Sequence, residues 1–174
     1  MVMLVTGRTK GSQHAEIWDM SKEEFYFLQT RHTFPIQISN AAFCQINQTI
    51  HVIGGSLNRS NGSSNICWKF QNKRWNISSS LLVKRSGLRC IHLDEESIWV
   101  TGGFDGISHL KSTEILELGK ASLEKTEKGP DLPARMSHHA MVKLDRNNIL
   151  IIGGYDGKYR QNINVNTSYM CKCC

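Results

Sequence analysis

Four short apolar segments, each ending in glycine at a nearly constant interval, constrain this chain more than any other feature. The first glycines of the four lie at positions 7, 54, 102 and 153, so the intervals are 47, 48 and 51 residues. A short run of apolar and β-branched residues closed by glycine is typical of a strand buried on both faces. Three of the segments end in a glycine pair; the four are Leu4–Arg8, His51–Gly55, Trp99–Gly103 and Leu150–Gly154. The chain is therefore predicted to repeat one strand-based unit four times.

Further strand-like segments recur on both sides of the glycines. One precedes the glycine segment, in Ala42–Ile46, Leu88–Leu93 and Ala140–Leu144. Another follows it, in Glu16–Trp18, Asn65–Phe70 and Ser112–Leu118, and a weaker one comes later, around Trp75–Ile77 and Leu123–Lys125. Turn-forming residues separate the segments, and no helical periodicity extends over a long window. These patterns predict an all-β chain of short antiparallel strands, in units near residues 1–36, 37–83, 84–133 and 134–168.

The residues after the last two glycine pairs carry a family resemblance. Phe104-Asp105-Gly106 and Tyr155-Asp156-Gly157 follow the glycine pairs directly, while Phe70 and Trp75 stand where an aromatic pair belongs later in the second unit. In these positions the chain resembles kelch repeats, in which each unit is one four-stranded blade of a β-propeller. The resemblance implies a tight backbone turn at the glycines, and a Trp75 that packs between neighbouring blades. The scaffold residues are then Gly54, Gly55, Gly102, Gly103, Gly153, Gly154 and Trp75.

The repeat is incomplete when it is compared with a closed kelch-type propeller. The chain holds about three and a half to four blades, whereas kelch propellers resemble one another in having about six. Arg8 replaces the second glycine of the first unit, the chain begins in the second strand of one blade, and residues 169–174 form a cysteine-rich tail that fits no blade position. We expect a fragment, an incomplete gene model or a degenerate copy. A compact four-bladed ring and closure by self-association are the alternatives.

Composition and charge narrow the kind of partner. The chain has 174 residues, of which 40% are hydrophobic and 21% charged, as in an ordinary globular domain. Its net charge of +6 is scattered, with Lys73-Arg74 and Lys84-Arg85 as the densest basic stretches, which disfavours nucleic acid as a partner. No apolar stretch is long enough to span a membrane and the N-terminus has no signal-peptide pattern, so we expect a cytoplasmic protein. Asn-x-Ser/Thr sequons support an extracellular alternative; they begin at Asn47, Asn58, Asn61, Asn76 and Asn166.

Candidate partner-binding residues lie in the loops after the glycine segments and in the links between units. Successive turns of an antiparallel unit alternate between its two ends, so these loops and links emerge at the same end. Loops on a rigid scaffold commonly carry binding residues, and arginine can grip a carboxylate with two N–H groups. Arg85-Ser86-Gly87-Leu88 resembles the Arg-Ser pattern with which kelch adaptors contact a ligand peptide; the alternative is that the arginines cap strand ends or pair with nearby acids. The candidates are Arg59, Arg85, Ser86, Asp105, His109, Arg135, His138, Asp156 and Arg160.

The leading functional prediction is a module that binds a protein or peptide, without catalysis, cofactor or metal. The kelch resemblance suggests the substrate-recognition part of a cullin-type ubiquitin-ligase adaptor, whose BTB and helical linker domains this sequence does not contain. A second hypothesis is the remnant of a kelch-like copper oxidase, with His138, His139, Tyr155 and Cys171 as raw material. Adjacent histidines in a strand point to opposite faces, and no set of Cys, His and carboxylates has metal-ligand spacing, which argues against it. A soft-metal or palmitate site is the alternative to an accidental tail for Cys171, Cys173 and Cys174.

Overall fold

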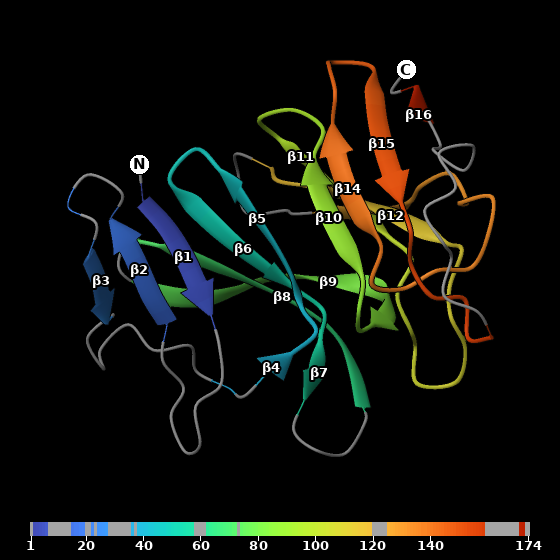
Figure 1. Ribbon diagram of the computed structural model, residues 1–174, viewed down its shortest axis with the longest axis horizontal. Helices are drawn as coiled ribbons and strands as arrows, with labels where there is room; N and C mark the ends of the chain where they lie inside the picture. The colour runs from blue at the N-terminus through green and yellow to red at the C-terminus, as the bar shows by residue number, and fades with distance from the viewer. Residues whose placement is uncertain are drawn as a thin grey trace.

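The computed structural model describes residues 2–6, 15–19, 22, 24–27, 36, 38–57, 62–72, 74–119, 125–158 and 171–172. Every regular element in these segments is a β-strand, so the prediction of an all-β chain is confirmed. No helix within them has the length and apolar character needed to cross a membrane. Figure 1 shows that the sheets follow one another across the molecule in sequence order.

The strands form four antiparallel sheets, one for each predicted unit. The first sheet contains β1 (Val2–Thr6), β2 (Ala15–Asp19) and β3 (Glu24–Phe27). The second contains β5 (Ala42–Ile46), β6 (Thr49–Ile53), β8 (Gly62–Gln71) and β9 (Arg74–Arg85), with a short ladder of β4 (Ile38–Ser39) and β7 (Ser56–Leu57) at one end. The third contains β10 (Arg89–His92), β11 (Ser97–Thr101), β12 (Thr113–Glu117) and β13 (Lys125–Lys128). The fourth contains β14 (Ala140–Lys143), β15 (Asn148–Ile152) and β16 (Cys171–Lys172).

The cysteine-rich tail differs from its prediction. Cys171 and Lys172 form β16 and pair with Ile149 and Asn148 of β15. These two residues therefore belong to the fourth sheet, in the position of its third strand, and the expectation that they fit no position in a unit is wrong. The signal was missed because a two-residue strand is too short to show an alternating pattern.

The last strand of the second sheet is longer than the sequence indicated. A weak segment was predicted around Trp75–Ile77, whereas β9 has 12 residues. Two register shifts interrupt its pairing with β8, and such irregularities bend a strand. β9 consequently reaches the third sheet, where the carbonyl of Ser80 accepts a hydrogen bond from Thr126 Oγ1 at 2.8 Å.

The glycine pairs have positive φ angles, as expected for the tight backbone turn that the resemblance implies. Their φ angles are 62°, 55° and 68° at the first glycine (Gly54, Gly102, Gly153) and 101°, 100° and 108° at the second (Gly55, Gly103, Gly154). A Cβ atom on Gly102 would lie 2.3 Å from the carbonyl oxygen of Met136, which belongs to the link entering the fourth sheet. A Cβ atom on Gly54 would lie 2.6 Å from the carbonyl oxygen of Arg85, where the chain leaves the second sheet and enters the third. The glycines thus let each link pass directly against the sheet before it.

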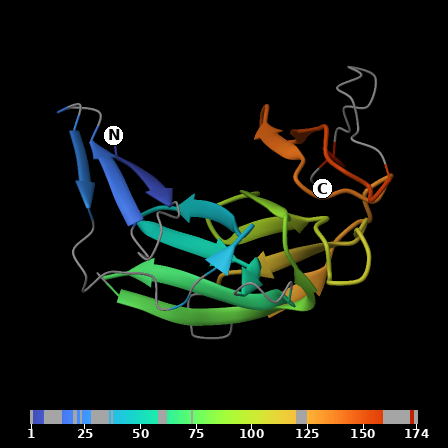
Figure 2. The same cartoon turned by 60° about the horizontal axis from the view of Figure 1, so that its bottom comes forward.

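The described sheets form an open arc. Figure 2 shows the first and fourth sheets standing apart at its two ends, with the second and third sheets between them. Strands β5, β10 and β14, one from each of three successive sheets, lie next to one another. The links that connect these sheets meet at the end of the molecule opposite to the β14–β15 turn.

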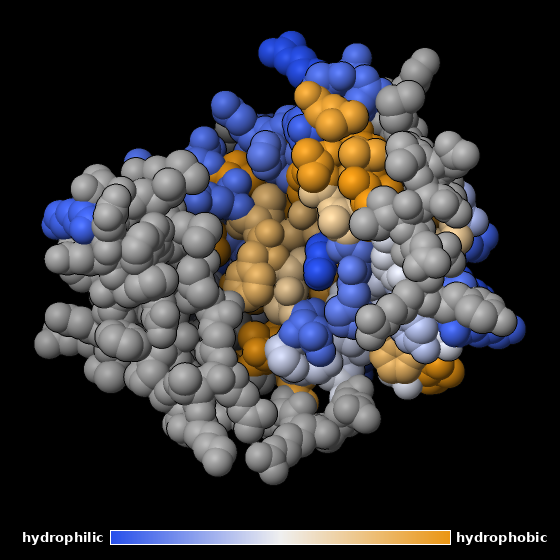
Figure 3. All heavy atoms as spheres, in the orientation of Figure 1, coloured by the Kyte–Doolittle hydropathy of each residue, from blue (hydrophilic) through white to orange (hydrophobic). Residues whose placement is uncertain are grey.

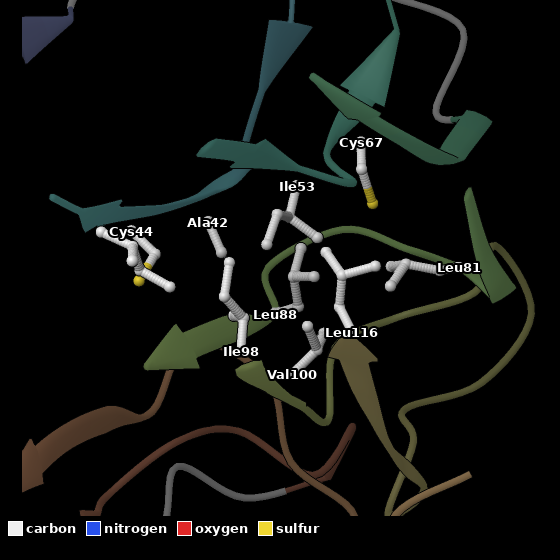
Figure 4. Packing of buried hydrophobic residues seen from close by; sticks show 10 residues of the cluster. Ala42, Cys44, Ile53, Cys67, Leu81, Leu88, Ile98, Val100 and Leu116 are labelled. Atoms are coloured by element: carbon white, nitrogen blue, oxygen red, sulfur yellow. The ribbon is translucent and has the colours of Figure 1, made fainter. Parts of the chain in front are cut away.

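Two hydrophobic cores fill the space between successive sheets. The first core joins the second and third sheets (Figure 4); it contains Ala42, Cys44, Ile46, Ile53, Cys67, Leu81, Leu88, Ile98, Val100 and Leu116. The second joins the third and fourth sheets and contains Trp99, Leu132, Met136, Ile149 and Ile151. Because side chains alternate along a strand, β11 places Ile98 and Val100 in the first core and Trp99 in the second. Each buried residue of this kind contributes about 1.5–3 kcal/mol, which holds the sheets face to face.

Some large apolar groups lie outside these cores. Trp75 packs on Phe70 within the second sheet, with ring centroids 4.9 Å apart, so its expected role between neighbouring blades stays a prediction. Hydrophobic side chains also gather at the surface over the β14–β15 hairpin (Figure 3). Val142 and Leu144 of this hairpin region are 49% and 55% exposed.

Candidate functional site

Each link lies against the glycine loop of its own unit. Ser86 and Phe104 exchange backbone hydrogen bonds of 2.9 and 2.8 Å, and Ser137 and Tyr155 exchange two of 2.9 Å. Ser39 and Ser56 form the corresponding pair in the second sheet. The links and glycine loops therefore emerge together at one end of the sheets, which we call the loop end.

A second set of backbone hydrogen bonds joins the links to one another. The N–H of Gly87 donates to the carbonyl of Asn40 at 2.8 Å, and the N–H of His138 donates to the carbonyl of Gly87 at 2.7 Å. All three residues have positive φ angles, of 53° at Asn40, 62° at Gly87 and 55° at His138. His138 thus occupies a left-handed backbone position that asparagine and glycine fill in the two preceding units.

Arg85, predicted to contact a partner, is completely buried. Its Nε and Nη2 atoms each lie 2.9 Å from Oε1 of Glu114. Nη1 donates to the carbonyls of Gly102 and Ser112 at 2.8 and 2.7 Å, and Nη2 donates to the Ser112 hydroxyl at 2.9 Å. The guanidinium therefore has partners for all its donors inside the protein. The binding prediction is wrong for Arg85, and its alternative, a pair with a nearby acid, describes this residue.

The carboxylate of Glu114 also binds the backbone of β9. It accepts hydrogen bonds from the backbone N–H groups of Leu82 and Val83, at 2.6 and 3.1 Å. Burial lowers the pKa of Arg85, and the negative charge of Glu114 offsets this lowering only in part. The pair consequently fastens the end of β9 to β12, and so the second sheet to the third.

At the loop end, where the third and fourth sheets meet, two histidines flank one serine. The Nδ1 atoms of His109 and His138 each lie 3.0 Å from the Oγ atom of Ser137. The ring of His109 lies between those of Phe104 and Tyr155, with centroid separations of 5.1 and 5.0 Å. We call these five residues the junction cluster: Phe104, His109, Ser137, His138 and Tyr155.

The junction between the second and third sheets has the same arrangement with smaller side chains. There the hydroxyl of Ser63 donates to the hydroxyl of Ser86 at 3.1 Å, and Ser86 is 7% exposed. Ser63 stands where His109 stands in the next unit, since each pairs with the residue that follows a glycine pair. Ser86 is therefore engaged between sheets, whereas the later junction replaces a hydroxyl and a glycine by two imidazoles.

The junction cluster contains two of the predicted site residues, His109 and His138, and a third, Arg135, lies beside it. Arg135 is exposed and donates from Nη1 to the carbonyl of His109 at 2.9 Å. Ile107, on the same loop, is 92% exposed, and Tyr155 is 37% exposed. The loop end thus offers apolar, aromatic and cationic groups side by side.

Asp105 and Asp156 direct their carboxylates into their own loops. Asp105 accepts hydrogen bonds of 2.7 Å from the N–H groups of Ile107 and Ser108, and Asp156 accepts one of 2.8 Å from Lys158. Burial acts to raise the pKa of Asp105, but the backbone hydrogen bonds outweigh it and the pKa is lowered. Both aspartates therefore shape their turns.

Two further residues lie near His138: Arg89, which was not singled out from the sequence, and His139, which was considered there only as a possible copper ligand. Burial first, and then the charges of Arg89 and His109, lower the pKa of His138. His139 is 1% exposed, and its Nε2 lies 2.7 Å from the hydroxyl of Thr101. Burial lowers the pKa of His139 to about 4.

The serine of the junction cluster could have been found from the sequence. Ser39, Ser86 and Ser137 are 47 and 51 residues apart, close to the glycine intervals, and this recurrence was not noticed. Arg59 and Arg160, two predicted contact residues, lie outside the described residues. Of the sequons, Asn47 and Asn76 are exposed, while Asn58, Asn61 and Asn166 lie outside the described part of the chain.

The histidines were also weighed as metal ligands. Among the residues that the structure describes, no three His, Cys, Asp or Glu side chains gather so that they could hold a metal ion. His138 and His139 differ in surroundings, since the first is exposed in the junction cluster and the second is buried. Cys171, proposed as a copper-oxidase residue, pairs with Ile149 through its backbone.

Comparison with known proteins gives one distant relative to report. The sequence is 28% identical over 170 residues to the spermatocyte protein spe-26 of Caenorhabditis elegans. The match covers 93% of this chain and 29% of that protein, so the chain spans less than a third of its relative's length. No family model matches the chain.

Proposed function

We propose that this chain is part of a kelch-type β-propeller whose loop end binds another protein. Four antiparallel sheets in sequence order support the fold, and hydrophobic cores join the last three of them face to face. Glycine pairs with positive φ and links that repeat the same backbone bonds support it further. Radial repetition of four-stranded sheets is the arrangement of a propeller.

The observation that carries the binding proposal is the junction cluster with its exposed neighbours. Backbone hydrogen bonds fix the cluster on both sides, so it is held rigidly at the loop end. Tyrosine and arginine are enriched among the residues that contribute most to protein–protein affinity, and Tyr155 and Arg135 are both accessible here. A rigid surface of this kind binds with little loss of conformational entropy.

A wider role follows if the module belongs to a longer protein. Joined to domains that bind a cullin, it would select the substrate of a ubiquitin ligase. The loop end would then hold the substrate, and the sheets would serve as the scaffold. Co-precipitation of a cullin with the longer protein, and its loss when those domains are removed, tests this role.

The binding proposal is tested with the chain as bait in a cell extract. A junction variant, Ile107→Ser with Arg135→Gln, changes two exposed side chains at the loop end. Its control is Arg146→Gln, an exposed residue in the β14–β15 turn at the opposite end. We expect quantitative mass spectrometry to find partners that the wild type and the control retain and the junction variant loses. Identical partners for all three proteins would contradict the proposal.

A further inference from the structure

Two cysteine thiols meet where the second sheet packs on the third. Cys44 lies in β5 and Cys90 in β10, and these two strands lie next to each other. Cys44 is part of the first core, and Cys90 packs against that core. The thiol of Cys90 donates a hydrogen bond to the sulfur of Cys44. Both cysteines are free thiols, so their sulfurs are available to react with each other.

The packing of successive sheets brings the same two positions together in each of two junctions. Cys44 and Ile91 are equivalent, because each pairs with the residue three places before the first glycine of its unit. Cys90 and Met141 are equivalent, because each pairs with the residue two places before that glycine. Ile91 and Met141 both pack against the second core. The contact between the cysteines therefore follows from the architecture, and of these two junctions only theirs has a thiol at both positions.

The hydrogen bond gives the two thiols different acidities. It lowers the pKa of Cys44; burial opposes this effect, and a backbone hydrogen bond from His92 adds to it. The same hydrogen bond, followed by burial, raises the pKa of Cys90 well above its usual value. The thiolate, and not the thiol, is the nucleophile in sulfur chemistry. Cys44 is therefore the attacking group of the pair, and Cys90 holds the proton.

The third cysteine of the first core has different surroundings. Cys67 is 0% exposed, and Figure 4 shows it on the other side of the core from Cys44. Its thiol reaches the carbonyl of Asn65, on its own strand, at 4.0 Å. Cys44 is 9% exposed and Cys90 is partly exposed, so a molecule as small as hydrogen peroxide has access to this pair. The pair therefore combines contact, acidity and access, which Cys67 does not.

We propose that Cys44 and Cys90 form a reversible disulfide under peroxide, which joins the second sheet to the third. The Cys44 thiolate attacks one oxygen of hydrogen peroxide and the O–O bond breaks; the departing hydroxide takes up the proton that the thiol had released and becomes water. The sulfur of Cys90 then attacks the sulfenic acid on Cys44, the S–O bond breaks, and the proton of Cys90 leaves in a second water molecule. The peroxide gains the two electrons that the sulfurs lose.

A disulfide here adds a covalent joint to a junction that is otherwise held by non-covalent contacts. The buried Arg85–Glu114 pair connects β9 to β12, whereas the disulfide connects β5 to β10 of the same two sheets. Residues 44 and 90 are 90 − 44 = 46 positions apart, so the bond closes a long loop in the unfolded chain. Loops of this length give the larger stabilisations among disulfides, and we expect the melting temperature to rise by about 5–15 °C. This site acts whether or not the loop end binds a partner.

Peptide mapping of the full chain after brief exposure to hydrogen peroxide tests the proposal. Trypsin places the three cysteines in separate peptides, residues 32–59, 60–69 and 90–111. We expect 32–59 to be linked to 90–111 within one chain, and dithiothreitol to release the two peptides. Absence of this link, a link to 60–69 in its place, or a link only between two chains would each overturn the proposal. So would a link that forms as fast in urea as in the folded protein, because the fold would then not hold the thiols together.

Two alanine variants connect the link to its effect on stability. Cys90→Ala removes one thiol of the pair, and its control, Cys67→Ala, removes a thiol of the same core that lies outside the pair. We expect peroxide to raise the melting temperature of the wild type and of the control by about 5–15 °C, and to leave that of Cys90→Ala unchanged. Each protein is compared with its own reduced form, so a lower starting stability of a variant does not affect the result. An equal rise in Cys90→Ala, or no rise in linked wild type, contradicts the proposal.

Discussion

The Nε and Nη2 atoms of Arg85 both lie 2.9 Å from one oxygen of Glu114, and the two side chains are 0% and 2% exposed. One residue ends the last strand of the second sheet, and the other lies in the third strand of the next. Their pair is thus a joint between repeats and not a surface contact.

Removing Arg85 should destabilise the protein strongly. Arg85→Ala leaves the Glu114 carboxylate buried without its counter-ion, which costs about 3–5 kcal/mol of unfolding free energy. Urea denaturation followed by circular dichroism measures the loss. Arg74→Ala, at an exposed arginine of the same strand, is the control and should change the free energy by less than about 0.5 kcal/mol. Comparable losses of unfolding free energy in the two variants would show that the buried pair stabilises the protein no more than an exposed arginine does.

A graded series of glycine substitutions should separate crowding from backbone strain. Gly102→Ala places a Cβ atom 2.3 Å from a backbone oxygen at a φ of 55°, and should cost about 2–5 kcal/mol. Gly106→Ala has a φ of 109° but open space, so strain alone should cost about 1–3 kcal/mol. Gly62→Ala has neither problem and should be nearly neutral. Thermal or urea unfolding that ranks the three differently would contradict this account of the glycine pairs.

The buried His139 should make the protein less stable in mild acid. Its folded-state pKa of about 4 lies below the ordinary value of 6.5 for histidine, so the unfolded chain binds the proton first. The contribution is fully present above about pH 6.5 and is lost as the pH falls towards 4, by roughly 3 kcal/mol in total. The variant His139→Leu copies Leu88 of the preceding unit and should flatten the dependence of unfolding free energy on pH. An unchanged slope in the variant would assign the acid sensitivity to other groups.

The two hydrophobic cores should report separately on the two junctions. Leu116→Ala opens a cavity in the first core and Ile151→Ala one in the second, each at about 2–5 kcal/mol. In a repeat structure each unit is stabilised mainly by its neighbours. Hydrogen exchange with mass spectrometry should therefore show that Ile151→Ala increases exchange in β14 and β15 more than in β5 and β6. Leu116→Ala should increase exchange in β5 and β6 more than in β14 and β15. Uniform loosening in both variants would show that the sheets unfold as a single unit.

The strands next to the glycine segments could be predicted because the glycines and the runs of apolar residues are local features of the sequence. The strands β5, β6, β10, β11, β14 and β15 lie within a residue or two of the segments expected for them. β9 and β16 could not be placed in the same way. The length of β9 depends on register shifts against β8, and β16 forms through two pairings with β15. Both depend on tertiary contacts that no local pattern carries.

The candidate site was predicted in part for the same reason. Antiparallel geometry alone indicates that loops and links share an end, so His109, Arg135 and His138 were found together. The same geometry does not show whether a side chain is buried. Arg85 was therefore wrongly predicted to contact a partner, because its position beside a link suggested that it was exposed. Its environment is set by Glu114, which is 29 residues away in the sequence.

The hydrogen bonds that run from His138 to Gly87 and from Gly87 to Asn40 use only main-chain atoms. These positions require a left-handed backbone conformation but no particular side chain, since three different residues occupy them. Such a position can be altered by mutation without loosening the architecture around it. New ligand preferences can therefore evolve there one unit at a time, while the neighbouring units keep theirs.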